Sequence, residues 1–160
     1  MKNELDVIPY MVYDHVSMSE QELAQIVNSF SYPDKVAVFS AYVGERLNRR
    51  HRPGRALERI IYSWDIVCDY GIFRDLQRHR IVSDLAWQRL SPRLGYDIPE
   101  LIEKAGLADT YMNSFDTSLE LYSSLQQAGK ELEAQYAVLF GHKMRWKVTM
   151  NAREAMHFIE

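Results

Sequence analysis

Three adjacent cationic or titratable side chains end the stretch Phe73-Arg74-Asp75-Leu76-Gln77-Arg78-His79-Arg80, which is followed by Ile81-Val82-Ser83. Arginine presents a planar fork of N–H donors that fits phosphate or carboxylate, and a histidine ring can donate, accept or stack. Residues 72–77 are predicted to form a helix that places Arg78, His79 and Arg80 near its C-terminal end. The stretch is therefore a candidate anion-binding site, with a solvated basic turn as the alternative.

Length and composition indicate one domain. The chain has 160 residues, of which 47% are hydrophobic and spread along the sequence, enough for a sizeable core. No apolar run reaches membrane-spanning length and Met1-Lys2-Asn3-Glu4 does not begin a signal peptide, so we expect a cytoplasmic protein without membrane contact. The single cysteine, Cys68, excludes an internal disulfide and a cysteine metal cluster, and we interpret it as a buried small hydrophobe.

The charge is distributed unevenly. Residues 46–93 contain eleven arginines, no lysine and five carboxylates, a net +6, whereas the other residues contain eight basic and 17 acidic side chains, a net −9. Arginine alone suits defined anion recognition better than loose attraction, for which lysine serves equally well. The acidic flanks and the lack of zinc-finger spacing or an RNP-type run disfavour nucleic acid as a partner.

The periodicity predicts an α+β fold that is mainly helical. We expect one domain over residues 1–160, with a helical N-terminal part at 1–50 and a motif-bearing part at 51–160. Apolar stripes predict a helix that begins after Ser17 or Ser19, a second that ends near residues 46–48, and a long one at 109–127. Residues 57–67 look extended, 83–89 could form a helical turn, and alternation at 143–150 predicts a half-buried strand.

A second group of candidate residues opens the last predicted helix. Asn151 is a favourable N-cap, and Arg153 and His157 lie four residues apart on one helix face. An arginine in a first turn opposes the helix dipole, which suggests an anion at the helix start or an ion pair with a nearby carboxylate.

The stretch Asn48-Arg49-Arg50-His51-Arg52-Pro53-Gly54-Arg55 is predicted to be a loop, because Pro53-Gly54 signals a turn. It displays five cationic or titratable groups, so it is either a binding loop or a solvated one.

Arg78-His79-Arg80, together with Asn151-x-Arg153-x-x-x-His157-Phe158, resembles the flavin-dependent thymidylate synthase (ThyX) family. The resemblance covers most of the chain from about residue 56. The loop at 48–55 and the stretch Leu94-Gly95-Tyr96-Asp97-Ile98-Pro99 resemble a divergent branch whose longer members contain two ThyX-like units in tandem, and this chain resembles the second unit.

The resemblance implies an α+β fold with helices packed on a small, mostly antiparallel sheet, assembled as a homotetramer or paired with a second ThyX-like unit. It implies reductive methylation of dUMP to dTMP with FAD, NADPH and methylenetetrahydrofolate, without a metal or a cysteine nucleophile. The residues that it assigns to FAD are Arg78, His79, Arg80, Asn151, Arg153 and His157. The residues that it assigns to dUMP binding are Arg78, Gln88 and Arg89, and it assigns no catalytic residue.

Several positions depart from the family pattern. Gln88 occupies the place of a serine that contacts dUMP, Asp75 that of a glutamine, and Gln135 that of a nucleotide-binding arginine. The chain ends two residues before another family arginine, as expected of a truncated unit. A catalytically degenerate FAD- or nucleotide-binding or scaffolding domain is therefore the alternative to a thymidylate synthase, and a nucleic-acid-binding module is a third, less favoured one.

Overall fold

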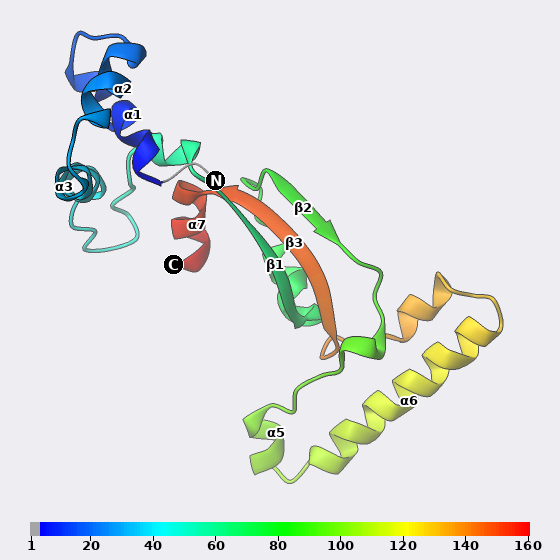
Figure 1. The fold of residues 1–160 in the computed structure, drawn as a ribbon. Coiled ribbons are helices and arrows are strands. Elements are labelled where there is room, and N and C mark those ends of the chain that lie inside the picture. Colours follow the sequence, from blue (N-terminus) through cyan, green and yellow to red (C-terminus); the bar gives the residue numbers. More distant parts are fainter. Residues whose placement is uncertain (1–3) are drawn as a thin grey trace. The chain divides into compact units, whose positions relative to one another are not determined.

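The computed structural model describes residues 4–160 (Figure 1). Residues 1–3, which belong to the expected domain and to the Met1-Lys2-Asn3-Glu4 start, lie outside the described part. The chain divides into two compact units. Unit 1 contains the chain up to Ser63 with Ile81–Ser83 and Thr149–Glu160, and unit 2 contains Trp64–Arg80 and Asp84–Val148. Each unit is described by itself, and the single domain over residues 1–160 stays a prediction.

Short helices build the beginning of unit 1. They are η1 (Glu4–Val7), α1 (Ile8–Val12), η2 (Tyr13–His15), α2 (Glu20–Asn28) and α3 (Tyr32–Val43), where η marks 3-10 helices. Ser19, one of the two residues predicted to cap this helix, is the N-cap of α2. Ser31 is the N-cap of α3. Each hydroxyl accepts a hydrogen bond from the backbone N–H three residues on, and the carboxylate there accepts one from the cap's N–H.

The end of α3 differs from the prediction. The helix stops at Val43 rather than near residues 46–48, because Gly44 takes a φ of 67° and its N–H bonds to the Ser40 carbonyl at 2.9 Å. The core of unit 1 lies where α1 meets η3 (Arg55–Arg59) and the start of α7 (Ala152–Ile159). Ile8 and Leu57 at its centre are fully buried.

Three antiparallel strands form the sheet, in the order β1-β3-β2. They are β1 (Ile61–Asp69), β3 (Lys143–Asn151) and β2 (Asp84–Trp87), and β1 and β3 each carry residues of both units. Within unit 1, the Ala152 N–H bonds to the Ile60 carbonyl at 2.8 Å, and within unit 2 the Tyr70 N–H bonds to the His142 carbonyl at 2.9 Å. The expected α+β fold with a small antiparallel sheet is confirmed.

The middle strand follows its predicted pattern, whereas β2 does not. Met144, Trp146, Val148 and Met150 are buried, and the residues between them are half-buried or exposed. The predicted helical turn at 83–89 is wrong, because this segment pairs with β3: the Gln88 N–H bonds to the Arg145 carbonyl at 3.1 Å. The extended segment predicted from residue 57 begins only at Ile61, after η3.

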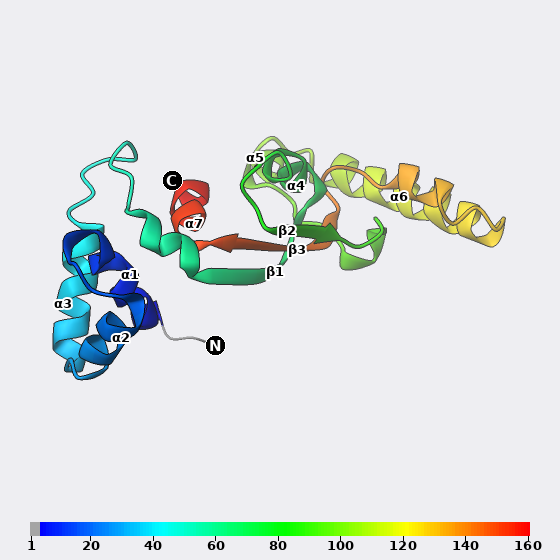
Figure 2. The same ribbon diagram turned by 90° about the horizontal axis from the view of Figure 1, so that it is seen from above.

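Unit 2 contains helices as well as its part of the sheet. They are α4 (Tyr70–Leu76), η4 (Pro92–Leu94), α5 (Glu100–Lys104), α6 (Ala108–Gln127) and η5 (Glu133–Ala137). Phe73 of α4 meets Trp146 of β3 edge-on, with ring centroids 5.3 Å apart. The segment with η5 runs back beside α6 (Figure 2), where the Ser118 hydroxyl donates to the Ala137 carbonyl at 2.6 Å.

Cys68 is half-buried rather than fully buried, and the Trp146 indole N–H donates to its sulfur at 3.2 Å. Across residues 4–160, no helix is both long and apolar enough to span a membrane. The same residues bring together no group of three side chains suited to bind a metal ion.

Candidate functional site

Arg78, His79 and Arg80 follow the C-terminus of α4 in unit 2, as the sequence predicted. Phe73 is 2% exposed and anchors this short helix against the sheet. The chain leaves the helix through two tight turns, in which the Arg78 N–H bonds to the Asp75 carbonyl and the His79 N–H to the Leu76 carbonyl at 3.1 Å. Cationic side chains are favoured here, because the last carbonyls of a helix carry partial negative charge.

The two arginines of this motif present their guanidinium groups to solvent. Arg78 pairs with Asp75, and both side chains of that pair are largely exposed. Arg80 is exposed too, and no ion pair with it is found within residues 4–160. An exposed ion pair contributes about 0–1 kcal/mol, so an incoming phosphate could replace Asp75 as the partner of Arg78 at little cost.

Gln88 and Arg89, the residues expected on the dUMP side, follow β2 and are exposed. The Gln88 backbone is fixed by its bond to β3, and Arg89 lies 3.7 Å from Glu131. Beside them is a cavity of about 610 Å³. Its lining residues come from distant segments: Tyr70, Leu90, Leu132, Glu133, Gln135, Tyr136 and Val138.

The sequence did not reveal this cavity, because no local pattern joins residues 70, 90 and 132–138. One of its lining residues was noted for another reason: Gln135 replaces a family arginine. Its side-chain oxygen accepts a hydrogen bond from the Leu90 backbone N–H at 3.0 Å, and its amide nitrogen donates to the Leu132 carbonyl at 3.4 Å. Gln135 therefore orders the cavity wall but carries no charge for a phosphate.

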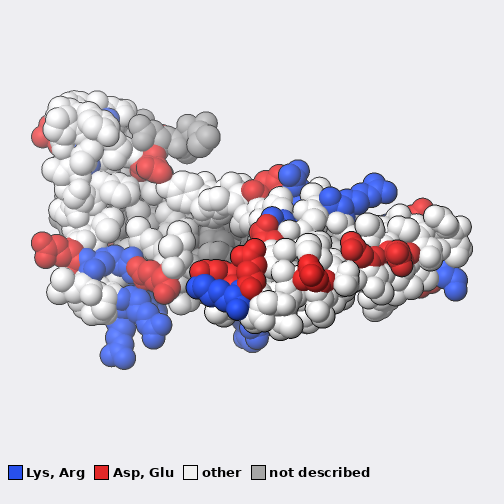
Figure 3. Space-filling model, turned by 90° about the horizontal axis from the view of Figure 1, so that it is seen from below, with Lys and Arg blue, Asp and Glu red and all other residues white. Residues whose placement is uncertain are grey.

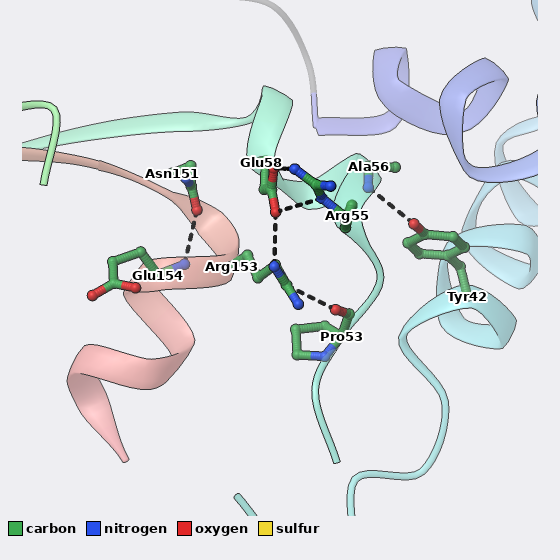
Figure 4. A network of polar contacts seen from close by, with 8 residues as sticks. All are labelled: Tyr42, Pro53, Arg55, Ala56, Glu58, Asn151, Arg153 and Glu154. Carbon is green, nitrogen blue, oxygen red and sulfur yellow. Dashed lines mark hydrogen bonds and ion pairs between the residues drawn. The ribbon is translucent and has the colours of Figure 1, made fainter. Parts of the chain in front are cut away.

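Asn151 and Arg153 lie at the start of α7 in unit 1 (Figure 4). Asn151 is the predicted N-cap, and its side-chain oxygen accepts a hydrogen bond from the Glu154 N–H at 2.8 Å. Arg153 donates to a Glu58 carboxylate oxygen at 2.7 Å and to the Pro53 carbonyl at 3.0 Å. Of the two interpretations of Arg153, the structure shows the ion pair with a carboxylate.

Glu58 joins two arginines in this network (Figure 4). It also accepts from Arg55, with distances of 3.1 and 3.2 Å to the two carboxylate oxygens. The hydrogen bond from Arg55, and then that from Arg153, lower the pKa of Glu58 against the opposing effect of burial. Its carboxylate is therefore ionised at neutral pH and neutralises part of this arginine-rich surface. His157, one turn after Arg153 on α7, is exposed.

The two groups of predicted FAD residues thus belong to different units, and the fit of each can be judged separately. In unit 2, two exposed guanidinium groups with one weak intrachain ion pair match the donor chemistry that a diphosphate needs. In unit 1, the Asn151 oxygen and two Arg153 donor nitrogens already have intrachain partners. The donor set fits the flavin's diphosphate best at Arg78–Arg80.

The sequence model of the family Thy1, described as thymidylate synthase complementing protein, matches residues 11–160. The chain belongs to the Thy1 family. The resemblance to ThyX seen in the motifs is thereby confirmed.

Similar sequences occur in Chlamydia pneumoniae and Thermoplasma acidophilum. The chain is 32% identical over 142 residues to a UPF0159 protein of Chlamydia pneumoniae. The aligned region covers 89% of this chain and 26% of that protein. It is 35% identical over 116 residues to a UPF0159 protein of Thermoplasma acidophilum, covering 72% of this chain and 23% of the relative. The chain therefore spans about a quarter of the length of these relatives.

A solved structure has the same fold. The UMP/dUMP methylase PolB from Streptomyces cacaoi, bound with 5-Br dUMP, matches with a TM-score of 0.68 over 99% of this chain and 72% of that one. The sequence identity is 16%, so the likeness concerns the fold. It confirms a ThyX-like arrangement of helices and sheet for this Thy1 chain.

Proposed function

We propose that this Thy1 chain is a nucleotide-binding domain that takes part in the reductive methylation of dUMP to dTMP. The observation that supports this most is the Arg78-His79-Arg80 motif at the end of α4, whose two arginines are exposed, in a chain that matches the Thy1 family over residues 11–160. Support for a nucleotide substrate also comes from the fold neighbour, which is a UMP/dUMP methylase. The proposed co-substrates are NADPH and methylenetetrahydrofolate.

The proposed role of the chain's residues is binding and orientation. Arg78 and Arg80 bind phosphate oxyanions through bidentate hydrogen bonds, and Asp75 releases Arg78 when the anion arrives. His79 adds a ring that can stack or donate beside them. A bound flavin, once reduced by NADPH, would supply the hydride for the reduction, so the protein would need no acidic or nucleophilic side chain for that step. Gln88 and Arg89 are proposed for the dUMP side, where Arg89 can exchange Glu131 for a phosphate.

A flavin titration tests the cofactor part of this proposal. We expect FAD to bind with a change in its absorbance and fluorescence, and Arg78→Gln with Arg80→Gln to weaken binding at least about tenfold, because two charge-assisted contacts are lost. The control is Arg93→Gln, which removes an exposed arginine of unit 2 outside the motif. No binding by the parent chain, or equal weakening by the control, would contradict the assignment.

The alternative function is a degenerate nucleotide-binding or scaffolding domain. Two observations favour it: Asp75 pairs with Arg78, and the Gln135 amide is engaged with backbone groups where the family places an arginine. Tritium release from 5-tritiated dUMP with methylenetetrahydrofolate, FAD and NADPH separates the two functions. Turnover supports the synthase, whereas FAD binding without tritium release supports the degenerate domain.

The proposed assembly is a homotetramer or a pair with a second ThyX-like unit. Large apolar side chains of unit 2 are exposed around η5, among them Leu132 at 60%, Tyr136 at 92% and Phe140 at 64%. Exposed apolar clusters of this kind are typical of interaction surfaces. Light scattering after size exclusion measures the mass, and a monomer that still turns over dUMP would exclude the assembly as a requirement.

A further inference from the structure

The loop between α3 and η3 is fixed at both of its ends. At its start, the Arg46 guanidinium forms an ion pair with Glu160 at 2.6 Å and donates to the His51 carbonyl at 2.7 Å. At its end, Pro53 is buried and its carbonyl accepts from Arg153 at 3.0 Å. The loop is thus tied to α7 on either side of its tip.

The tip itself is a defined turn. The Asn48 side-chain oxygen accepts from the Arg50 N–H at 2.9 Å, and the Asn48 carbonyl accepts from the His51 N–H at 3.0 Å. Gly54 then passes so close to Tyr42 that an added Cβ would lie 2.2 Å from its ring. The Tyr42 hydroxyl accepts from the Ala56 N–H at 2.9 Å (Figure 4), so the chain re-enters unit 1 at a fixed place.

Three arginines project from this turn. Arg49, Arg50 and Arg52 are exposed, and no ion pair with them is found in the part of the chain that the structure describes. The arginines on either side differ: Arg46 pairs with Glu160 and Arg55 with Glu58. Figure 3 shows the resulting pattern, in which basic side chains gather at the lower left with acidic ones beside them.

Like charges within a few residues repel each other. The turn holds three arginines close together, whereas the arginine on each side of it is paired with a carboxylate. We propose that residues 48–52 form a binding site for a di- or polyphosphate group. Several adjacent phosphate oxyanions on one small ligand match three guanidinium forks and relieve their repulsion.

A small polyphosphate fits this site better than a nucleic acid. A nucleic acid site needs a basic stripe that contacts many phosphates along the backbone. Here the uncompensated charge is confined to four residues, and the arginines at both borders are already neutralised by Glu160 and Glu58. An extended polyanion would leave the tip and meet those carboxylates.

Binding of inorganic tripolyphosphate and of ADP, measured by isothermal titration calorimetry, tests the site. We expect Arg49→Gln/Arg50→Gln/Arg52→Gln to weaken tripolyphosphate binding at least about tenfold, because the charge-assisted contacts are lost. The same three positions changed to lysine retain the charge but lose the forked geometry, so we expect an intermediate affinity. The matched control, Arg93→Gln/Lys104→Gln/Lys130→Gln, removes three exposed cations of unit 2 and should change binding by less than about twofold.

The ligand source follows from the two probes. Tighter binding of ADP than of tripolyphosphate identifies a nucleotide, and the reverse identifies a free polyphosphate. The proposal is overturned if the parent chain binds neither probe, if the control weakens binding as much as the loop variant, or if a single-stranded oligonucleotide alone binds with steep salt dependence. The loop variant leaves Arg78 and Arg80 unchanged, so tripolyphosphate binding that it loses belongs to residues 48–52 and not to the phosphate-binding motif of the proposed function.

Discussion

Glu58 accepts hydrogen bonds from Arg55, three residues before it, and from Arg153, which the chain reaches 95 positions later. Its side chain and that of Arg153 are each 31% exposed, so the pair is partly shielded from water. Such a pair is more sensitive to losing one partner than a fully exposed one, because the remaining charge is partly desolvated. The carboxylate is thus a connection between η3 and the start of α7.

We predict that Glu58→Gln lowers the free energy of unfolding by about 1–3 kcal/mol, because the three hydrogen bonds from Arg55 and Arg153 lose their carboxylate acceptor. Urea unfolding at neutral pH measures the change. Glu100→Gln is the control: it removes an exposed pair with Lys104, for which we expect less than about 0.5 kcal/mol. The pKa of Glu58 is lowered in the folded state. The loss should therefore disappear as the pH falls through that folded pKa, and a pH-independent loss would contradict the electrostatic cause.

His142 gives a second prediction at this scale. Its ring is 2% exposed and faces Phe115, and its Nδ1 accepts a hydrogen bond from the Leu139 N–H at 3.0 Å. Burial lowers the pKa of His142 below its usual 6.5. The unfolded chain therefore binds more protons between the folded pKa and 6.5, so the protein loses stability as the pH falls through that window, by at most about 1.4 kcal/mol per pH unit.

His142→Asn tests this pH dependence, because an asparagine oxygen can accept from the same N–H but does not titrate. We expect the slope of unfolding free energy against pH to be smaller in the variant below pH 6.5. His15→Asn is the control, since His15 is exposed. An unchanged slope in His142→Asn would exclude His142 as the cause.

At the scale of elements, the start of α7 depends on its cap. We predict that Asn151→Ala lowers the free energy of unfolding by about 1 kcal/mol, because the Glu154 N–H loses the side-chain oxygen that accepts from it. Asn151→Ser should retain most of the stability, since a serine hydroxyl can replace that acceptor. Thermal unfolding followed by circular dichroism measures both, and equal losses in the two variants would show that the cap is not the cause.

The sequence predicted those helices and strands whose patterns lie within the element itself, such as alternating burial or an N-cap residue. The alternation of Met144, Trp146 and Val148 predicted β3, and the capping pattern limited the start of α2 to Ser17 or Ser19, of which Ser19 is the cap. β2 was missed because its four residues are too few to show a periodic pattern. They form a strand because they pair with β3, and the sequence does not reveal that pairing. The partner of Arg153 was foreseen as a kind of group, a carboxylate, but not as Glu58, since only the tertiary fold brings η3 beside α7.

At the scale of the whole molecule, the two units share strands. β1 passes from unit 1 into unit 2 after Ser63, and β3 returns from unit 2 into unit 1 at Thr149. A strand loses its ladder hydrogen bonds when its neighbour melts, so the units should unfold together although each has its own core.

The three tryptophans, Trp64, Trp87 and Trp146, all belong to unit 2 and report on it alone. We predict that Asn151→Ala, a change in unit 1, lowers the urea midpoint of tryptophan fluorescence by the same amount as the midpoint of circular dichroism. Both signals should give the same midpoint and a free energy of unfolding that is about 1 kcal/mol lower than in the parent chain, because a single cooperative transition gives coincident midpoints. If the fluorescence midpoint stayed at the parent value while the circular dichroism curve split, the shared strands would not couple the two units.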